Sequence, residues 1–226
     1  MLTLALETSG RLGAAALLDN DQIVAARELA ATQRTAEALV PLIHDLLLEL
    51  DRRAADLELI GVTVGPGSFT GLRIGVTLAK TLAYACGAAV VGVNSLEVIA
   101  VQTLLDAEHD ACCCVMDAHR SQLFTGSYRR DSNGQVVEAQ ATRIETVDDW
   151  LGSLTAGICV AGPVLARLKD RLPTGCVVSP AASWAPRPQT VGQLARRRQL
   201  SGSTDDLWPL APAYYRASAA EETARK

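Results

Sequence analysis

The chain has 226 residues, of which 49% are hydrophobic and 20% are charged, and its 21 Lys and Arg against 25 Asp and Glu leave a formal net charge of −4. This balance excludes an intrinsically disordered chain, which carries fewer apolar residues and more unpaired charge. With 17 Gly and 9 Pro it is also no collagen-like or low-complexity fibre. The mild acidity argues against a free-standing nucleic-acid binder, since such proteins neutralise phosphates with a basic surplus.

The cysteines and the N-terminal residues indicate the cellular compartment in which the protein is expected. None of the six cysteines forms a CxxC pair, and three of them are consecutive in an apolar run at 112–114. We expect them to be small core residues in a reducing environment and predict no metal site. The N-terminus lacks a basic region, and Glu7 interrupts the first apolar run. No apolar stretch reaches the ~20 residues of a membrane span, so we expect a cytoplasmic protein with no membrane partner.

The first half of the chain predicts alternating strands and helices. A buried strand at 2–6 ends in Glu7 and is followed by a hairpin of 13–18 and 22–29 around a polar turn. Apolar residues at helical spacing predict a helix over 35–51. A strand at 57–64, a helix over 70–85, a strand at 88–93 and a helix that begins near Ser95 complete this half. The pattern is that of an α/β fold.

The second half repeats the opening of the first. An apolar run at 111–116 ends in Asp117, and segments 122–129 and 135–141 flank a second polar turn. In each half, a strand that ends in an acid leads into a hairpin whose second strand begins with Gln and two β-branched residues. We interpret this as an internal duplication. The predicted lobes are residues 1–105 and 106–226, joined by a linker near 105–110.

The sharpest local motif is the sequence GPGSFTGLRIG at 65–75, between a predicted strand and a predicted helix. Its glycines fit a tight turn with close packing, and the alternative is an anion-binding loop made by Gly65, Gly67, Ser68 and Thr70. Gly71, Gly75 and Ala79 then recur every four residues, so they lie near one helix face. Another backbone must approach that face, either from the chain's own sheet or from a second subunit.

This motif, together with LALETS at 4–9, resembles the bacterial TsaB (YeaZ) family. The resemblance extends to GVNSLE at 92–97, MDAHR at 116–120 and PAYYR at 212–216. It implies the actin-like/Hsp70-like ATPase (ribonuclease H-like) fold with two related lobes. It also implies a vestigial cleft in which Glu7, Thr8 and Ser9 face Asp117. The family usually has Asp where this chain has Glu7, which weakens a nucleotide role.

The resemblance also bears on catalysis. The catalytic relative, TsaD, binds a metal through two histidines on a helix of its first lobe, and the matching stretch here, Thr35-Ala36-Glu37, has none. The histidines present, at 44, 109 and 119, are scattered, and no HExxH or GxSxG motif exists. We therefore predict no catalytic residues, no metal and no cofactor. The alternative hypothesis is a metal- or ATP-dependent enzyme, an M22-type glycoprotease or a transferase, that uses the cleft between Glu7 and Asp117.

The function that the resemblance implies is that of a non-catalytic partner, which binds and activates TsaD in the threonylcarbamoylation of adenosine N6 in tRNA. The ATPase TsaE would join the assembly, the chain alone would form a homodimer, and tRNA would be contacted only indirectly. A direct tRNA contact through Arg196–Arg198 is the less favoured alternative. We expect Gly75→Leu to weaken association with TsaD and to leave the chain folded. The predicted partner-binding residues, on the helices 35–51 and 70–85, are Leu39, Ile43, Gly71, Leu72, Gly75, Val76 and Ala79.

Overall fold

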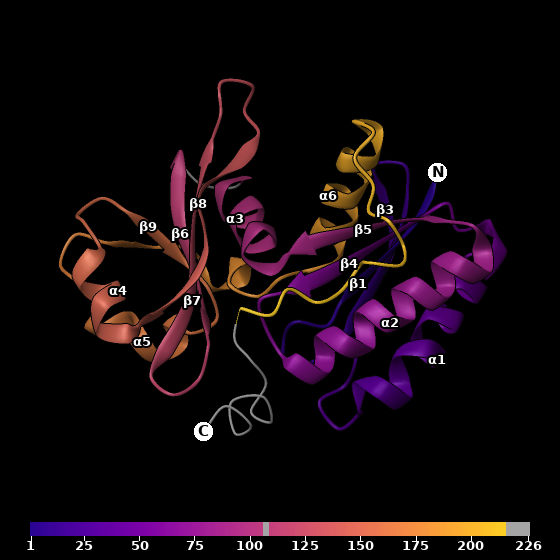
Figure 1. Cartoon of the computed structure of the whole chain (residues 1–226), viewed down its shortest axis with the longest axis horizontal. Helices are drawn as coiled ribbons and strands as arrows, with labels where there is room; N and C mark the ends of the chain where they lie inside the picture. The colour runs from indigo at the N-terminus through magenta and orange to yellow at the C-terminus, as the bar shows by residue number, and fades with distance from the viewer. Residues whose placement is uncertain (106–108, 216–226) are drawn as a thin grey trace.

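The structure is a computed structural model that describes residues 1–105 and 109–215. It contains two five-stranded sheets, each with helices packed on it (Figure 1). The first sheet has the strand order β3-β2-β1-β4-β5, and the second has the order β10-β9-β6-β7-β8. The strands of the first sheet are β1 (Leu2–Glu7), β2 (Ala14–Asp19), β3 (Gln22–Glu28), β4 (Leu59–Gly65) and β5 (Ala89–Asn94). Those of the second are β6 (Ala111–Asp117), β7 (Gln122–Arg130), β8 (Val136–Thr146), β9 (Cys159–Ala161) and β10 (Val177–Val178).

The two sheets share one topology. In the first, β1, β2 and β3 are antiparallel neighbours, and β4 and β5 continue parallel to β1. In the second, β6, β7 and β8 are antiparallel, and β9 and β10 continue parallel to β6. This is the arrangement of the actin-like, ribonuclease H-like fold, and its occurrence in both halves confirms the predicted duplication. The helices are α1 (Thr35–Glu49), α2 (Phe69–Cys86), α3 (Ser95–Leu105), α4 (Val147–Ser153), α5 (Leu165–Leu168) and α6 (Pro188–Leu200). Three short 3-10 helices are η1 (Ala54–Asp56), η2 (Lys169–Arg171) and η3 (Ala181–Ser183).

One face of the first sheet is covered by α1 and α2. Alternate residues of β1, such as Leu4 and Leu6, point to these helices and join a core that includes Leu46 of α1 and Val76 of α2. The side chain of Ser68 caps α2 by accepting a hydrogen bond from the N–H of Gly71, and the helix ends at Gly87 in the left-handed conformation.

The two sheets lie on either side of the predicted boundary at residues 105 and 106, but the helix packing crosses it. Helix α3, the last element before this boundary, packs mainly on β6, β7 and β8 of the second sheet. Helix α6, near the end of the chain, packs on β1, β2 and β4 of the first sheet. The final helix of each repeat therefore packs on the sheet of the other lobe, so the helices do not follow the predicted division at residue 105 (Figure 1). Residues 106–108 of the predicted linker lie outside the described residues.

After α6 the chain continues along the first lobe as a segment without helices, residues 203–215, which we call the C-terminal strap. The N–H of Asp205 bonds to the carbonyl of Val90 at 3.0 Å, and the N–H of Ala213 bonds to the carbonyl of Val64 at 2.7 Å. Between them, Lys80 of α2 donates to the carbonyls of Trp208 and Leu210. Within residues 1–105 and 109–215, no helix combines the length and apolar character that crossing a membrane requires.

Candidate functional site

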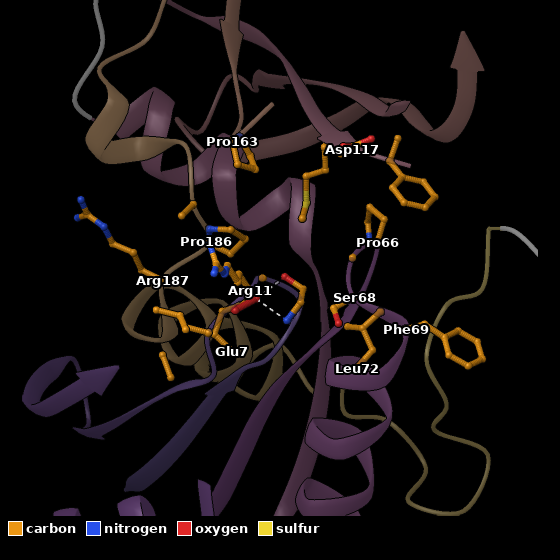
Figure 2. Close-up of a pocket in the computed structure, with 18 of the residues that line it drawn as sticks. Glu7, Arg11, Pro66, Ser68, Phe69, Leu72, Asp117, Pro163, Pro186 and Arg187 are labelled. Atoms are coloured by element: carbon orange, nitrogen blue, oxygen red, sulfur yellow. Dashed lines mark hydrogen bonds between the residues drawn. The ribbon is translucent and has the colours of Figure 1, made fainter. Parts of the chain in front are cut away.

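A cavity of about 1650 Å³ lies between the two lobes (Figure 2). The first lobe contributes Glu7 and Ser9 and the start of the glycine-rich loop, and the second lobe contributes Asp117. Tyr214 and Tyr215 of the C-terminal strap line it as well. The two strand-end acids that the sequence singled out therefore line one cavity.

Glu7 is the last residue of β1 and is buried at the edge of this cavity. Its Oε1 accepts hydrogen bonds from both the N–H (2.9 Å) and the hydroxyl of Ser9. Burial raises the pKa of the Glu7 carboxyl to about 7, because an ionised carboxylate loses its hydration there, and the Ser9 hydrogen bonds offset only part of this effect. Near neutral pH the carboxyl is thus protonated in a large share of molecules and held by its own loop.

Asp117 is also engaged within the chain. Its Oδ1 accepts from the N–H of His119 at 2.8 Å, and its Oδ2 lies 3.3 Å from Nη2 of Arg167. The turn that follows has three consecutive residues at positive φ, His119, Arg120 and Ser121. Arg167 thus neutralises the negative charge with which the Asp117 carboxylate would otherwise attract a cation in the cleft. Among the described residues, no group of three or more His, Cys, Asp and Glu side chains is placed to hold a metal ion.

The glycine-rich loop packs on the chain's own β1–β2 connection. The N–H of Ser68 donates to the carbonyl of Ser9 at 2.8 Å, and a Cβ on Gly67 would lie 2.3 Å from that same oxygen. Gly65 has a φ of +122° and lies against Ala213 of the strap, while Thr70 is exposed in the first turn of α2. The structure thus accounts for these glycines by the tight-turn alternative. Anion binding at the loop stays a prediction.

The glycines of α2 face the same segment. A Cβ on Gly71 would lie 2.1 Å from the carbonyl oxygen of Thr8, and a Cβ on Gly75 would lie 2.2 Å from its Oγ1. Of the two partners left open from the sequence, the backbone that approaches α2 is the chain's own. The expectation that Gly75→Leu leaves the fold intact is therefore wrong, because the new side chain would be driven into Thr8.

The other residues predicted to bind a partner are buried in the first lobe. Leu72 lies against Gly65 of the glycine-rich loop and lines the cavity. The other four lie in the core between α1, α2 and the first sheet: Leu39, Ile43, Val76 and Ala79. They stabilise the fold and offer no surface for docking. The predicted set thus forms no exposed surface, although the two helices that carry it do lie on the outside of the molecule (Figure 1).

The outward side of α1 presents a different apolar set, which the sequence reasoning missed. Val40 and Leu48 are 55% and 65% exposed, and the exposed His44 lies between them at a spacing of four residues. These three residues share one helix face. The signal was present in the sequence, since Val40 and Leu48 fall outside the stripe of Leu39, Leu42, Ile43, Leu46 and Leu47 that the first sheet buries.

The basic run at 196–198 is engaged within the molecule. Arg196 pairs with Asp21, while Arg197 and Arg198 both pair with Glu97 of α3. These ion pairs join α6 to the turn between β2 and β3 and to α3, so the basic run has a structural role. The less favoured tRNA contact at this run therefore gains no support.

Of the three histidines, His44 lies on α1, His109 precedes β6 and His119 lies in the turn after β6, which leaves them on separate elements.

The comparisons with known proteins decide the family. The model of the family described as "TsaD: tRNA N6-adenosine threonylcarbamoyltransferase" matches residues 28–169. The chain is 32% identical, over 98% of its own length and 96% of the relative's, to the tRNA threonylcarbamoyladenosine biosynthesis protein TsaB of Bacillus subtilis. The chain belongs to the TsaB (YeaZ) family. The TsaB protein of Escherichia coli is 28% identical over 59% of this chain and 58% of its own length. The solved structure of YeaZ from Pseudomonas aeruginosa, 24% identical, superposes with a TM-score of 0.82 over 94% of this chain and 99% of that one, which shows the same fold.

Proposed function

We propose that this chain acts in the biosynthesis of threonylcarbamoyladenosine in tRNA as a non-catalytic subunit that binds and activates TsaD. Membership of the TsaB family supports the pathway, because curated members carry it in their names. The similarity of residues 28–169 to the TsaD family model supports a pairing of two related folds. On this proposal TsaE joins the assembly, tRNA is contacted through TsaD, and the same surface forms a homodimer when TsaD is absent.

The observation that carries the proposal is the exposed face of α1, which consists of Val40, His44 and Leu48. No part of the described chain covers Val40 and Leu48. Exposed apolar side chains that share one helix face are the usual anchors of a protein interface. Burying about two such side chains contributes a few kcal/mol, enough to change an affinity by a factor of roughly 100 or more.

The contacts in the cleft favour this proposal over the enzyme hypothesis. A nucleotide- or metal-dependent enzyme needs carboxylates that are free to receive a cation or a proton at the reacting atoms. Glu7 is instead bonded to Ser9, and Asp117 is paired with Arg167.

The proposal is tested by the affinity for TsaD of the same organism, measured by calorimetry. Leu48→Asp places a charge in the centre of a buried interface, so we expect binding to weaken at least about tenfold and the rate of tRNA modification to fall with it. The matched control is Leu200→Asp at the end of α6, because Leu200 is exposed to nearly the same degree, at 68% against 65%. Equal affinities of the wild type and Leu48→Asp would show that the α1 face is not the docking surface.

A further inference from the structure

The C-terminal strap contacts both lobes through two consecutive tyrosines. On the first lobe, the ring of Tyr214 packs on Phe69 with 5.1 Å between centroids, and its hydroxyl accepts from Nε of Arg73 at 2.9 Å. On the second lobe, the ring of Tyr215 meets Phe124 of β7 edge-on at 6.0 Å. The strap therefore spans the cleft, and its two rings form part of the cavity wall.

Tyr215 also reaches the residue at which the chain first crosses between the lobes. Asn94 ends β5 of the first sheet and is followed directly by α3, which packs on the second sheet. Its Oδ1 accepts from the N–H of Leu96 at 2.8 Å, which caps α3. Its Nδ2 donates to Oγ1 of Thr142 in β8 at 2.9 Å and to the hydroxyl of Tyr215 at 3.1 Å. Both amide hydrogens are thus used, one on the second sheet and one on the strap.

The second crossing is held by another amide. Between η3 and α6 the chain passes back to the first lobe. Both the amide nitrogen and the amide oxygen of Gln102, on α3, form hydrogen bonds with the backbone of this segment. Its Nε2 donates to the carbonyl of Ala185 at 2.8 Å, and its Oε1 accepts from the N–H of Arg187 at 2.8 Å. The side chain is buried, so these hydrogen bonds have little competition from water.

We propose that Asn94, Gln102 and the C-terminal strap together hold the two lobes at one fixed opening. In a two-lobed protein the residues at the chain crossings are those that absorb the rotation when lobes close on a ligand. Here both crossings are bonded by buried or half-buried amides, and the strap adds a third attachment through the ring contacts of Tyr214 with Phe69 and of Tyr215 with Phe124. The molecule then behaves as one rigid body, and its outer surface does not depend on what occupies the cleft.

The test is the distribution of distances between the lobes, measured by pulsed electron paramagnetic resonance on the full chain. Spin labels are placed at Ala36→Cys on α1 and Gln140→Cys on β8, both of which are exposed positions. The two partly exposed cysteines, Cys86 and Cys176, are replaced by serine, and the other four native cysteines are buried and escape labelling. The labelled chain is diluted with an excess of unlabelled chain, so that a homodimer adds no distances between labels on different protomers, and we expect one narrow distribution for the parent protein.

Two variants remove contacts between the lobes in different ways. Asn94→Ser keeps a cap for α3 but removes the reach to Thr142 and Tyr215, so we expect a broader distribution that is shifted to longer distances. Tyr215→Phe removes only the hydroxyl and keeps the ring, so it broadens the distribution less and stays informative if Asn94→Ser fails to fold. The control is Trp208→Ala, because Trp208 lies on the same strap but its ring packs on Tyr84 of the first lobe.

An unchanged distribution in Tyr215→Phe and in any folded Asn94→Ser protein would overturn the proposal. So would a broad distribution in the parent protein, or a Trp208→Ala variant that broadens as much as Tyr215→Phe. None of these outcomes depends on binding to TsaD, so this proposal and the proposed function can fail separately.

Discussion

At the scale of single residues, the protonation of Glu7 predicts a pH dependence of stability. The pKa of its carboxyl is about 7 in the folded chain against an ordinary value of 4.5, so the folded state keeps a proton that the unfolded state loses. The contribution of Glu7 to stability is therefore present below pH 4.5 and is lost as the pH rises to 7. Over this window the free energy of unfolding falls by about 3 kcal/mol relative to a chain without the group.

Glu7→Gln tests this, because its amide keeps an oxygen for Ser9 and does not ionise. Urea denaturation at pH 4 and pH 8 should show the variant gaining stability relative to the wild type by about 3 kcal/mol as the pH rises. Any change in the free energy of unfolding that the substitution causes equally at both pH values cancels in this comparison. A difference between the two proteins that is the same at both pH values would contradict the raised pKa.

Gly75 gives a second prediction at this scale. Gly75→Ala should destabilise the fold by about 1–3 kcal/mol, since the added Cβ meets Oγ1 of Thr8. That hydroxyl is buried and has no hydrogen-bond partner among the described residues, so Thr8→Ala removes the obstacle without breaking a bond. In a double-mutant cycle followed by urea unfolding, the double variant should recover a large part of the loss. Strictly additive effects would mean that Thr8 and Gly75 do not meet in this way.

At the scale of elements, the sequence predicted the strands and helices more reliably than what covers them. The helices expected at 35–51 and 70–85 form at Thr35–Glu49 and Phe69–Cys86, because helical spacing of apolar residues is a local property. The same spacing cannot say whether a stripe faces the chain's own sheet or a partner. Leu39 and Val76 were therefore placed on a docking surface, although they lie in the core.

The pairing of sites far apart in the sequence was likewise only partly predictable. The family resemblance implied a cleft in which Glu7 and Asp117, the acids that end two equivalent strands, face each other, and both residues line one cavity. Nothing local in the sequence shows that Arg167 would pair with Asp117, or that Asn94 would bond to Thr142 and Tyr215. These contacts follow from the tertiary arrangement.

At the scale of the whole molecule, the exchange of α3 and α6 decides which pieces of the chain can fold. A fragment of residues 1–105 lacks α6, which covers one face of the first sheet. The fit there is close: a Cβ on Gly61 of β4 would lie 2.7 Å from the Cβ of Ala195, and a Cβ on Gly192 would lie 2.3 Å from Leu18. The fragment also exposes α3, whose residues from Ser95 to Leu104 are nearly all buried in the full chain.

We therefore expect residues 1–105 alone to aggregate or to lack a cooperative urea transition, since an uncovered apolar sheet face favours association. The matched protein joins residues 1–94 to 188–226 through a short Gly/Ser linker, which restores α6 and the strap to the first sheet and omits α3. It should unfold cooperatively, with a urea m-value that fits its size. The matched protein has 133 residues besides its linker against 105 in the fragment, and most of the residues that it gains belong to α6 and the C-terminal strap. A cooperative transition in the 1–105 fragment, or none in the joined protein, would show that each sheet is stabilised by its own half of the chain and not by the exchanged helices.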